Sequence, residues 1–198
     1  MRKFNYLGVI LDEQLHWKEN TDCTCNKVNK RLGLLARIRS CLTLKAAKCV
    51  YNTLIEPILC YTDTVLGELS ATSSKTLQRL QNRAARIALR RDSSKYTFNV
   101  LGWAELETKR KRHKCVLVYK CLNNLIPQYL SDYFTRNYNV HSYNTRRRTD
   151  LHLPKVKLSL TKRTFRYSGS ALFNLLPRSM QKAESLSSFE ILINTHNF

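Results

Sequence analysis

The stretch KTLQRLQNRAARIALRR, residues 75–91, separates its basic and its apolar side chains at helical spacing. At about 100° per residue, the basic side chains fall within an arc of about 80°. They are Lys75, Arg79, Arg83, Arg86 and Arg90. The apolar side chains cluster about 120° away. They are Leu77, Leu80, Ala84, Ile87 and Ala88. The pattern predicts a helix that packs one face on a core and presents cations on another.

The whole chain shares this basic character. Its 198 residues carry 34 Lys and Arg against 14 Asp and Glu, a formal net charge of +20. Self-repulsion of that size favours a polyanionic partner, and nucleic acid ranks ahead of an anionic membrane or an acidic protein. A hydrophobic content of 43% is enough for a core, so the chain is not a disordered basic tail.

Signals for compartment are weak. The basic start of the chain has no apolar run behind it, and no segment approaches the roughly eighteen apolar residues of a membrane span. We therefore expect a soluble intracellular protein, nuclear or cytoplasmic, with no membrane partner. The odd number of cysteines, seven, favours reduced thiols. The spacing Cys23-x-Cys25 is tighter than a zinc knuckle, so we expect no metal site.

The periodicity predicts a mainly α protein in three parts. Residues 1–16 form a short β element, residues 17–136 a helical bundle, and residues 137–198 a smaller α+β unit. One or two compact domains suit this length.

Within the helical part, a second basic helix is predicted between residues 17 and 39, with Lys27, Lys30, Arg31 and Arg37 on its surface. Thr43 is a plausible N-cap for a third helix, which Pro57 should end or kink. Its expected apolar face comprises Leu44, Ala47, Tyr51, Leu54 and Ile58. Residues 71–74 are expected to supply a loop and a cap for the striped helix.

A further helix should start near Trp103 and stop at Pro127, with a charged first half that projects into solvent. Its basic run includes Lys109, Arg110 and Arg112. Alternation at period two from Leu151 to Tyr167 predicts strands or a hairpin. Short helices are expected around residues 170–176 and 187–193.

No residue pattern in the chain points to catalysis. The acidic residues include no Asp-Asp pair, the five histidines are scattered, and no glycine-rich phosphate loop occurs. Asp12 lies at a strand end, where a role in a turn is favoured over metal binding. We expect no enzymatic activity from these residues alone.

Short strings along the chain, in order, resemble a known family. They are FNYLGV (4–9), NKVNKRLGLL (26–35), LIEPILCY (54–61), LQNRAARI (80–87), LGW (101–103), PQYL (127–130) and NLLP (174–177). Together they resemble the palm end, thumb and post-thumb region of reverse transcriptases from non-LTR, LINE-type (jockey-like) retrotransposons. The chain departs from that pattern at Asn20 and Thr21, where His-Ile is typical, and at Leu66 and Phe173, where Trp is typical.

The resemblance implies that Phe4, Tyr6, Leu7 and Gly8 correspond to a primer-grip hairpin. An ordinary core strand with a turn glycine explains them equally well. In the family, catalytic aspartates of a Tyr-x-Asp-Asp loop lie upstream of the first string and hold the divalent metal, Mg. No cofactor is expected in this chain itself, and the palm and fingers of the same polyprotein are implied partners.

We therefore expect sequence-independent binding of an RNA or DNA template-primer through basic helices. The first group of phosphate-binding candidates is the basic stripe of residues 75–90. The second group comprises Lys27, Lys30, Arg31 and Arg37, and the basic run that contains Lys109, Arg110 and Arg112 adds further charge. Arg146, Arg147 and Arg148 are a third group, near Tyr138 and Tyr143, which suit stacking on bases. Two alternatives stay open: a structural or interaction remnant of a mobile element without a nucleic-acid role, and an unrelated basic helical protein of ribosomal or chromatin type.

Overall fold

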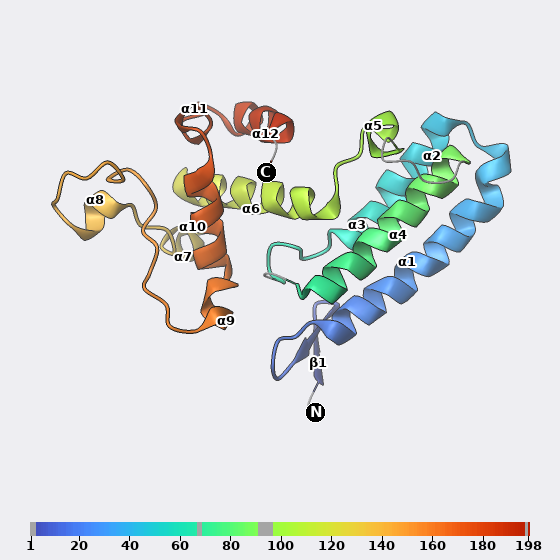
Figure 1. The fold of residues 1–198 in the computed structure, drawn as a ribbon, viewed down its shortest axis with the longest axis horizontal. Helices are drawn as coiled ribbons and strands as arrows, with labels where there is room; N and C mark the ends of the chain where they lie inside the picture. Colours follow the sequence, from blue (N-terminus) through green and yellow to red (C-terminus); the bar gives the residue numbers. More distant parts are fainter. Residues whose placement is uncertain (1–2, 67–68, 91–96, 197) are drawn as a thin grey trace. The chain divides into compact units, whose positions relative to one another are not determined.

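The computed structural model describes residues 3–66, 69–90, 97–196 and 198. Arg91 of the predicted stripe lies outside the described residues. The chain is mainly helical, as predicted, with one two-stranded antiparallel sheet near its start (Figure 1). None of the described helices is long and apolar enough to cross a membrane.

The chain divides into two compact units, Met1–Lys109 and Arg110–Phe198. The sequence places its boundaries instead after residues 16 and 136. The division falls earlier than 136 because residues 110–136 supply Cys115, Val118, Tyr119 and Phe134 to the core of the second unit. Residues 1–16 belong with the helices, since β2 contacts α1.

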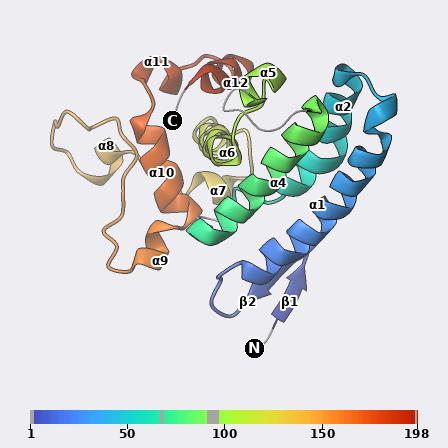
Figure 2. The same ribbon diagram turned by 45° about the vertical axis from the view of Figure 1, so that its right-hand side comes forward.

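Unit 1 is a bundle in which one β-hairpin precedes the helices. Its elements are β1 (Lys3–Tyr6), β2 (Val9–Asp12), α1 (Lys18–Ile38), the 3-10 helix η1 (Arg39–Cys41), α2 (Leu44–Val50), the π-helix η2 (Tyr51–Ile55), α3 (Glu56–Leu59), α4 (Ala71–Leu89) and α5 (Thr97–Leu101). Figures 1 and 2 both show α1 and α4 side by side. The start of α6 (Leu106–Leu122) completes the unit.

Unit 2 contains the rest of α6 and several short helices. They are α7 (Gln128–Ser131), α8 (Asn137–Val140), α9 (Ser159–Lys162), α10 (Phe165–Leu175), α11 (Arg178–Gln181) and α12 (Leu186–Thr195). The predicted helices around 170–176 and 187–193 correspond to α10 and α12.

The hairpin forms because the turn between its strands suits their twist. Leu7 and Gly8 both have positive φ, 49° and 81°, as a two-residue type I′ turn requires. The Tyr61 hydroxyl donates a 2.6 Å hydrogen bond to the Leu7 carbonyl and supports this turn. After β2, the Asp12 carboxylate accepts hydrogen bonds from the backbone N–H groups of Gln14, His16 and Trp17. The predicted turn role of Asp12 is therefore confirmed.

The third predicted helix contains a π turn. Thr43 caps α2 as expected, because its hydroxyl accepts from the Ala46 N–H. Pro57 has no N–H and leaves a carbonyl one turn earlier without its α-helical partner. The chain widens there, and the Glu56 N–H donates to the Tyr51 carbonyl, a π-helical bond. Pro57 is then accommodated in the first turn of α3.

The extra residue of the π turn shifts the buried face. Ala47 and Tyr51 are fully buried, as the sequence predicts. Within the turn the prediction fails at Leu54, which is 37% exposed while Ile55 enters the core. Beyond the turn, the predicted Ile58 is partly buried against the core, and its neighbour Leu59 is buried. One added residue rotates the following side chains by about 100°, so regular helical spacing identifies the wrong neighbours.

The striped helix is present, and its apolar face is buried as predicted. Leu77, Ala84 and Ala88 lie in the core, and Leu80 is 9% exposed. Residues 71–74 are not a loop but the first turn of α4. Ser70 caps the helix instead, because its hydroxyl accepts from the backbone N–H one turn later.

The core of unit 1 contains one fully buried amide, Gln81. Its Nε2 donates to the Tyr51 hydroxyl at 3.2 Å and to the Ala104 carbonyl at 3.0 Å, and its Oε1 accepts from Gln78. Tyr51 stacks on Trp103 with ring centroids 3.7 Å apart, and burial raises the pKa of this tyrosine. Gln81 thus joins α4 to η2 and to the segment that leads into α6.

Unit 2 has its own aromatic core. Tyr119 of α6 stacks on Phe189 of α12 at 4.4 Å, and Phe173 of α10 lies 6.1 Å from Phe189. Gly169 permits the close packing of α10 on α6, because a Cβ there would lie 2.9 Å from Val118 Cγ2. These contacts come from three helices far apart in sequence.

Two sequence expectations for unit 2 are wrong. The helix expected to run to Pro127 ends at Leu122, because Asn124 adopts φ 54° and the Leu125 N–H turns back to the Lys120 carbonyl. The period-two segment from Leu151 to Tyr167 forms no strand in the described residues, apart from an isolated bridge between Arg136 and Leu151. Pro154 removes a donor from this segment, and α9 and α10 occupy its second half.

Replacing Gln81 by Leu should lower the free energy of unfolding by about 2–4 kcal/mol, because the Tyr51 hydroxyl and the Ala104 carbonyl lose a buried partner. Urea denaturation followed by circular dichroism measures this change. Arg86→Gln, an exposed position of the same helix, is the control and should stay within about 0.5 kcal/mol. Equal stability of Gln81→Leu and the control would contradict the role of the buried amide.

The seven cysteines are all free thiols, and their reactivity should separate by burial. Burial raises the pKa of the Cys115 thiol to about 12 and that of Cys121 to about 11, whereas Cys41 and Cys49 are exposed. Because the thiolate is the nucleophile, iodoacetamide at about pH 8 should modify Cys41 and Cys49 first. Peptide mass spectrometry measures the rates. Labelling of Cys115 in the folded protein at the rate of Cys41 would contradict the buried core of unit 2.

Candidate nucleic-acid interface

The basic face of α4 points away from the core of unit 1. Lys75, Arg79, Arg83 and Arg86 are all exposed, on the side of the helix opposite Leu77 and Ala84. Among the described residues, none of these four forms an ion pair, whereas Lys3 pairs with Glu19 and Lys109 with Glu56. Their charge is therefore available to a polyanion.

Arg83 brings the stripe next to α1. Its Nη1 donates a 3.2 Å hydrogen bond to Asn29 Oδ1. Around α1, Lys30 and Arg37 lie within about 100° of Asn29, on the exposed side. These two cations therefore extend the surface of α4. We define the α4/α1 basic surface as Lys75, Arg79, Arg83, Arg86, Lys30 and Arg37.

The other two candidates on α1 do not join this surface. Lys27 and Arg31 each lie about 160° from Asn29 around the helix. Both are exposed, but on the far flank of α1. The four basic residues predicted as one track are thus divided between two sides of the same helix.

Arg90, the last residue of the predicted stripe, has a structural role. It caps α4 with φ 54°, and its Nη2 donates to the carbonyls of Arg39 and Ser40 at 2.7 and 2.8 Å. The Arg90 guanidinium thus compensates the partial negative charge of the carbonyl groups at the carboxyl end of α1 and is not directed at a phosphate. We therefore leave Arg90 out of the basic surface.

Arg39 makes the reciprocal contact and was not identified from the sequence. Its Nε and Nη2 both donate to the Ala88 carbonyl of α4, at 2.9 and 2.6 Å, and its Nη1 donates to the Leu42 carbonyl. Arg39 and Arg90 together clamp the carboxyl ends of α1 and α4. The sequence does place a basic residue at each predicted helix end, where such a side chain can bind the last carbonyl groups. Sequence spacing cannot show, however, that each arginine binds carbonyls of the other helix.

The basic run in α6 does not project freely, contrary to the sequence expectation. Lys109 forms an ion pair with Glu56 in unit 1. In unit 2, Arg112 donates to the His196 carbonyl at 3.3 Å, and Lys114 is buried with its Nζ 3.3 Å from Ser168 Oγ. Burial lowers the pKa of Arg112, and Arg110 is half-buried. Internal contacts thus occupy much of this charge.

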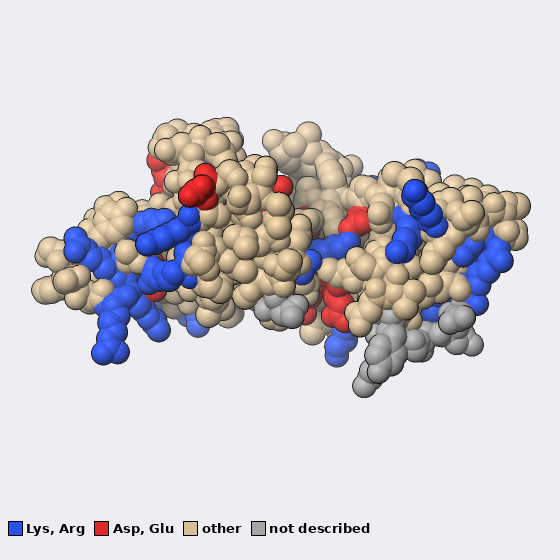
Figure 3. All heavy atoms as spheres, turned by 90° about the horizontal axis from the view of Figure 1, so that it is seen from above, with Lys and Arg blue, Asp and Glu red and all other residues tan. Residues whose placement is uncertain are grey.

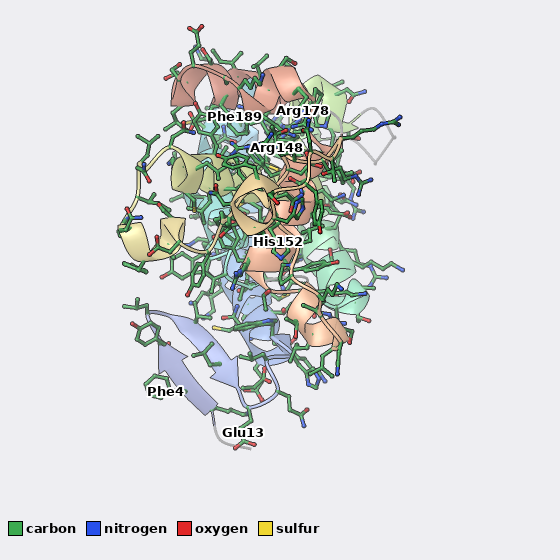
Figure 4. The ribbon with its side chains drawn as sticks, turned by 90° about the vertical axis from the view of Figure 1, so that its left-hand side faces the viewer. Phe4, Glu13, Arg148, His152, Arg178 and Phe189 are labelled. Atoms are coloured by element: carbon green, nitrogen blue, oxygen red, sulfur yellow. The ribbon has the colours of Figure 1, made fainter. Side chains whose placement is uncertain are left out.

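The hairpin residues are not an ordinary core strand. Phe4 and Tyr6 are 64% and 59% exposed and stack at 6.5 Å on the outer face of β1. Figure 4 labels Phe4 on this hairpin. Leu7 and Gly8 form its turn, with Leu7 74% exposed. The four candidates therefore lie together on one exposed hairpin.

The remaining candidates, Arg146, Arg147 and Arg148, lie in unit 2 and are exposed. Tyr138 and Tyr143 are exposed as well. Within either unit taken alone, the described residues bring no three His, Cys, Asp or Glu side chains together as a metal-ligand set. The expectation that these residues hold no metal of their own stays a prediction.

Comparison with protein-family models, curated proteins and solved structures finds no match for this chain. The positions that depart from the retrotransposon pattern are packed. Thr21, Leu66 and Phe173 are buried, and the Asn20 amide oxygen accepts from the Ile10 N–H at 3.1 Å. These four residues are thus integrated in the fold.

Replacing Arg39 by Met should lower the free energy of unfolding by about 1–3 kcal/mol, because the Ala88 carbonyl loses a charged donor. Urea denaturation measures the loss. Arg37→Met removes the same charge two residues away and should cost less than about 0.5 kcal/mol. If both variants lose the same stability, the clamp is not a determinant of the bundle.

Proposed function

We propose that unit 1 binds a nucleic-acid duplex through the α4/α1 basic surface, without reading its sequence. The observation that carries this proposal is the orientation of α4. Its apolar face is held in the core, while four exposed cations that form no ion pair among the described residues point outward. Arginines and lysines along one face of a packed helix suit phosphates, which position a partner but carry no sequence information.

We further propose that the chain is the palm end, thumb and post-thumb region of a non-LTR retrotransposon reverse transcriptase. The ordered strings from residue 4 to residue 177 support this assignment. The exposed hairpin of Phe4, Tyr6, Leu7 and Gly8 is compatible with a primer grip. The duplex would then be a template-primer of RNA and DNA inside the cell, nuclear or cytoplasmic.

In this proposal the chain holds a substrate and does not extend it. Polymerisation requires carboxylates around two metal ions, and the sequence contains no Asp-Asp pair. Mg and its carboxylates would belong to palm and fingers sequence of the same polyprotein. This chain would bind the phosphates of the duplex and thereby hold the duplex in position.

Replacing Arg79, Arg83 and Arg86 together by Gln should weaken duplex binding for many sequences alike. Each lost phosphate contact reduces the slope of log affinity against log salt by about 0.9, so three lost contacts reduce it by about 2.7. Fluorescence anisotropy of a labelled RNA–DNA duplex at several salt concentrations measures both quantities.

A matched control removes the same charge elsewhere on unit 1. Lys27, Arg31 and Lys45 are exposed and outside the α4/α1 basic surface, so their triple Gln variant should retain most of the affinity and slope. If the two triple variants lose the same affinity, the net positive charge of the chain, and not the α4/α1 basic surface, accounts for duplex binding. An unchanged affinity in the Arg79, Arg83 and Arg86 variant would favour the remnant without a nucleic-acid role.

A further inference from the structure

Unit 2 contains a loop whose backbone is fixed although its side chains are exposed. We name residues 145–150 the arginine loop. The Asn137 and Tyr138 N–H groups of α8 donate to the carbonyls of Asp150 and Arg148 at 2.9 and 3.0 Å. Asn137 Nδ2 donates to the Arg147 carbonyl at 2.8 Å. The loop is therefore held against α8 by its own main chain.

The side chains of this loop carry charge that the described residues do not neutralise. Between residues 142 and 166 the sequence has eight Lys and Arg and one acid, Asp150. Asp150 is already paired with Arg178, at 2.9 Å. Arg146, Arg147 and Arg148 are exposed and form no ion pair among the described residues. Figure 3 shows Lys and Arg side chains gathered at the α8 end of this unit, and Figure 4 labels Arg148 and Arg178 there.

Two exposed aromatic side chains accompany the arginines. Tyr138, 44% exposed, is hydrogen-bonded through its N–H to Arg148, and Tyr143, 74% exposed, begins the turn into the loop. In the described part of the chain, neither ring stacks on an aromatic side chain of the core, and Tyr143 lies beside His141 with ring centroids 5.9 Å apart. Aromatic rings next to cations carried by a fixed backbone provide stacking surfaces for unpaired bases.

A cavity lies next to one of these rings. It has a volume of about 370 Å³, and its lining includes Tyr138 and the amide residues Asn124, Gln128 and Asn139. Asp132 lines it as well, and its carboxylate accepts a 2.9 Å hydrogen bond from Gln128 Nε2, which leaves the amides of Asn124 and Asn139 for a ligand. Amides offer both donors and acceptors, as the edge of a nucleobase requires. The cavity therefore adds a place for a base beside the ring that would stack on it.

We propose that unit 2 binds single-stranded nucleic acid at this place. Phosphates lie on Arg146, Arg147 and Arg148, unpaired bases stack on Tyr138 and Tyr143, and one base edge enters the cavity. A duplex would hide its base faces from both rings, and a membrane would leave the amide-lined cavity unused. This function is separate from duplex binding by unit 1 and does not depend on it.

The test uses the full chain and a fluorescein-labelled oligo(U) of about twenty nucleotides, longer than typical single-strand sites. Replacing the three arginines by Gln should weaken binding at least about fivefold and reduce the salt slope by about 2, since each single-strand phosphate contributes about 0.7. Tyr138→Leu with Tyr143→Leu should weaken binding about tenfold at an unchanged slope, because stacking carries no charge. The Phe versions of both positions should bind as wild type.

A control for charge alone replaces Lys155, Lys157 and Lys162, which lie outside the arginine loop, by Gln. Its affinity should fall less than that of the arginine variant. Equal losses would overturn the built site, and so would unchanged oligo(U) binding in the Tyr→Leu variant. Tyr143→Leu alone guards against misfolding, because this ring is mostly in solvent and its loss should still reduce oligo(U) affinity.

The unit 1 variant with Arg79, Arg83 and Arg86 replaced separates the two proposals. It should lose duplex affinity and keep oligo(U) affinity, whereas the arginine-loop variant should do the reverse. Loss of both ligands in either variant would contradict separate sites.

Discussion

The buried amide of Gln81 and the apolar face of α4 together fix how α4 is rotated about its own axis, and the exposure of the α4/α1 basic surface depends on that rotation. A buried amide must keep its hydrogen bonds, and those of Gln81 reach Tyr51 and Ala104. With Gln81 facing inward, helical geometry places Arg79, Arg83 and Arg86 on the outer side. A polar contact in the core thus orients cations that never touch it.

Charge in this protein serves two purposes that look the same in the sequence. Arg39 and Arg90 close the ends of α1 and α4, and Lys109 pairs with Glu56. Arg79, Arg86 and Arg148 are exposed and form no ion pair among the described residues. The first group stabilises the fold, whereas the second group leaves an unbalanced field that attracts a polyanion.

The sequence predicts those features that follow from regular spacing. The apolar face of α4, the hairpin around Gly8 and the Thr43 cap were all accessible, because each depends on residues close in sequence. Features that depend on distant partners were not. The π turn before Pro57 redirects Ile55 into the core. Among the described residues, the alternation after Leu151 gives only an isolated bridge between Arg136 and Leu151 and no strand, because pairing depends on a partner distant in sequence. For the candidate interface, helical spacing in the sequence identifies the exposed cations of α4. It does not show that Arg39 and Arg90 bind carbonyl groups at the ends of neighbouring helices.

The central claim is that α4 binds a duplex with the face opposite Gln81, and NMR maps that face directly. In a ¹H–¹⁵N titration of the chain with an RNA–DNA duplex, we expect the largest shift changes at Lys75, Arg79, Arg83 and Arg86 of α4, together with Lys30 and Arg37 of α1. Lys27 and Arg31, on the far flank of α1, should change little. Changes centred on Lys27 and Arg31, or no changes along α4, would contradict the account.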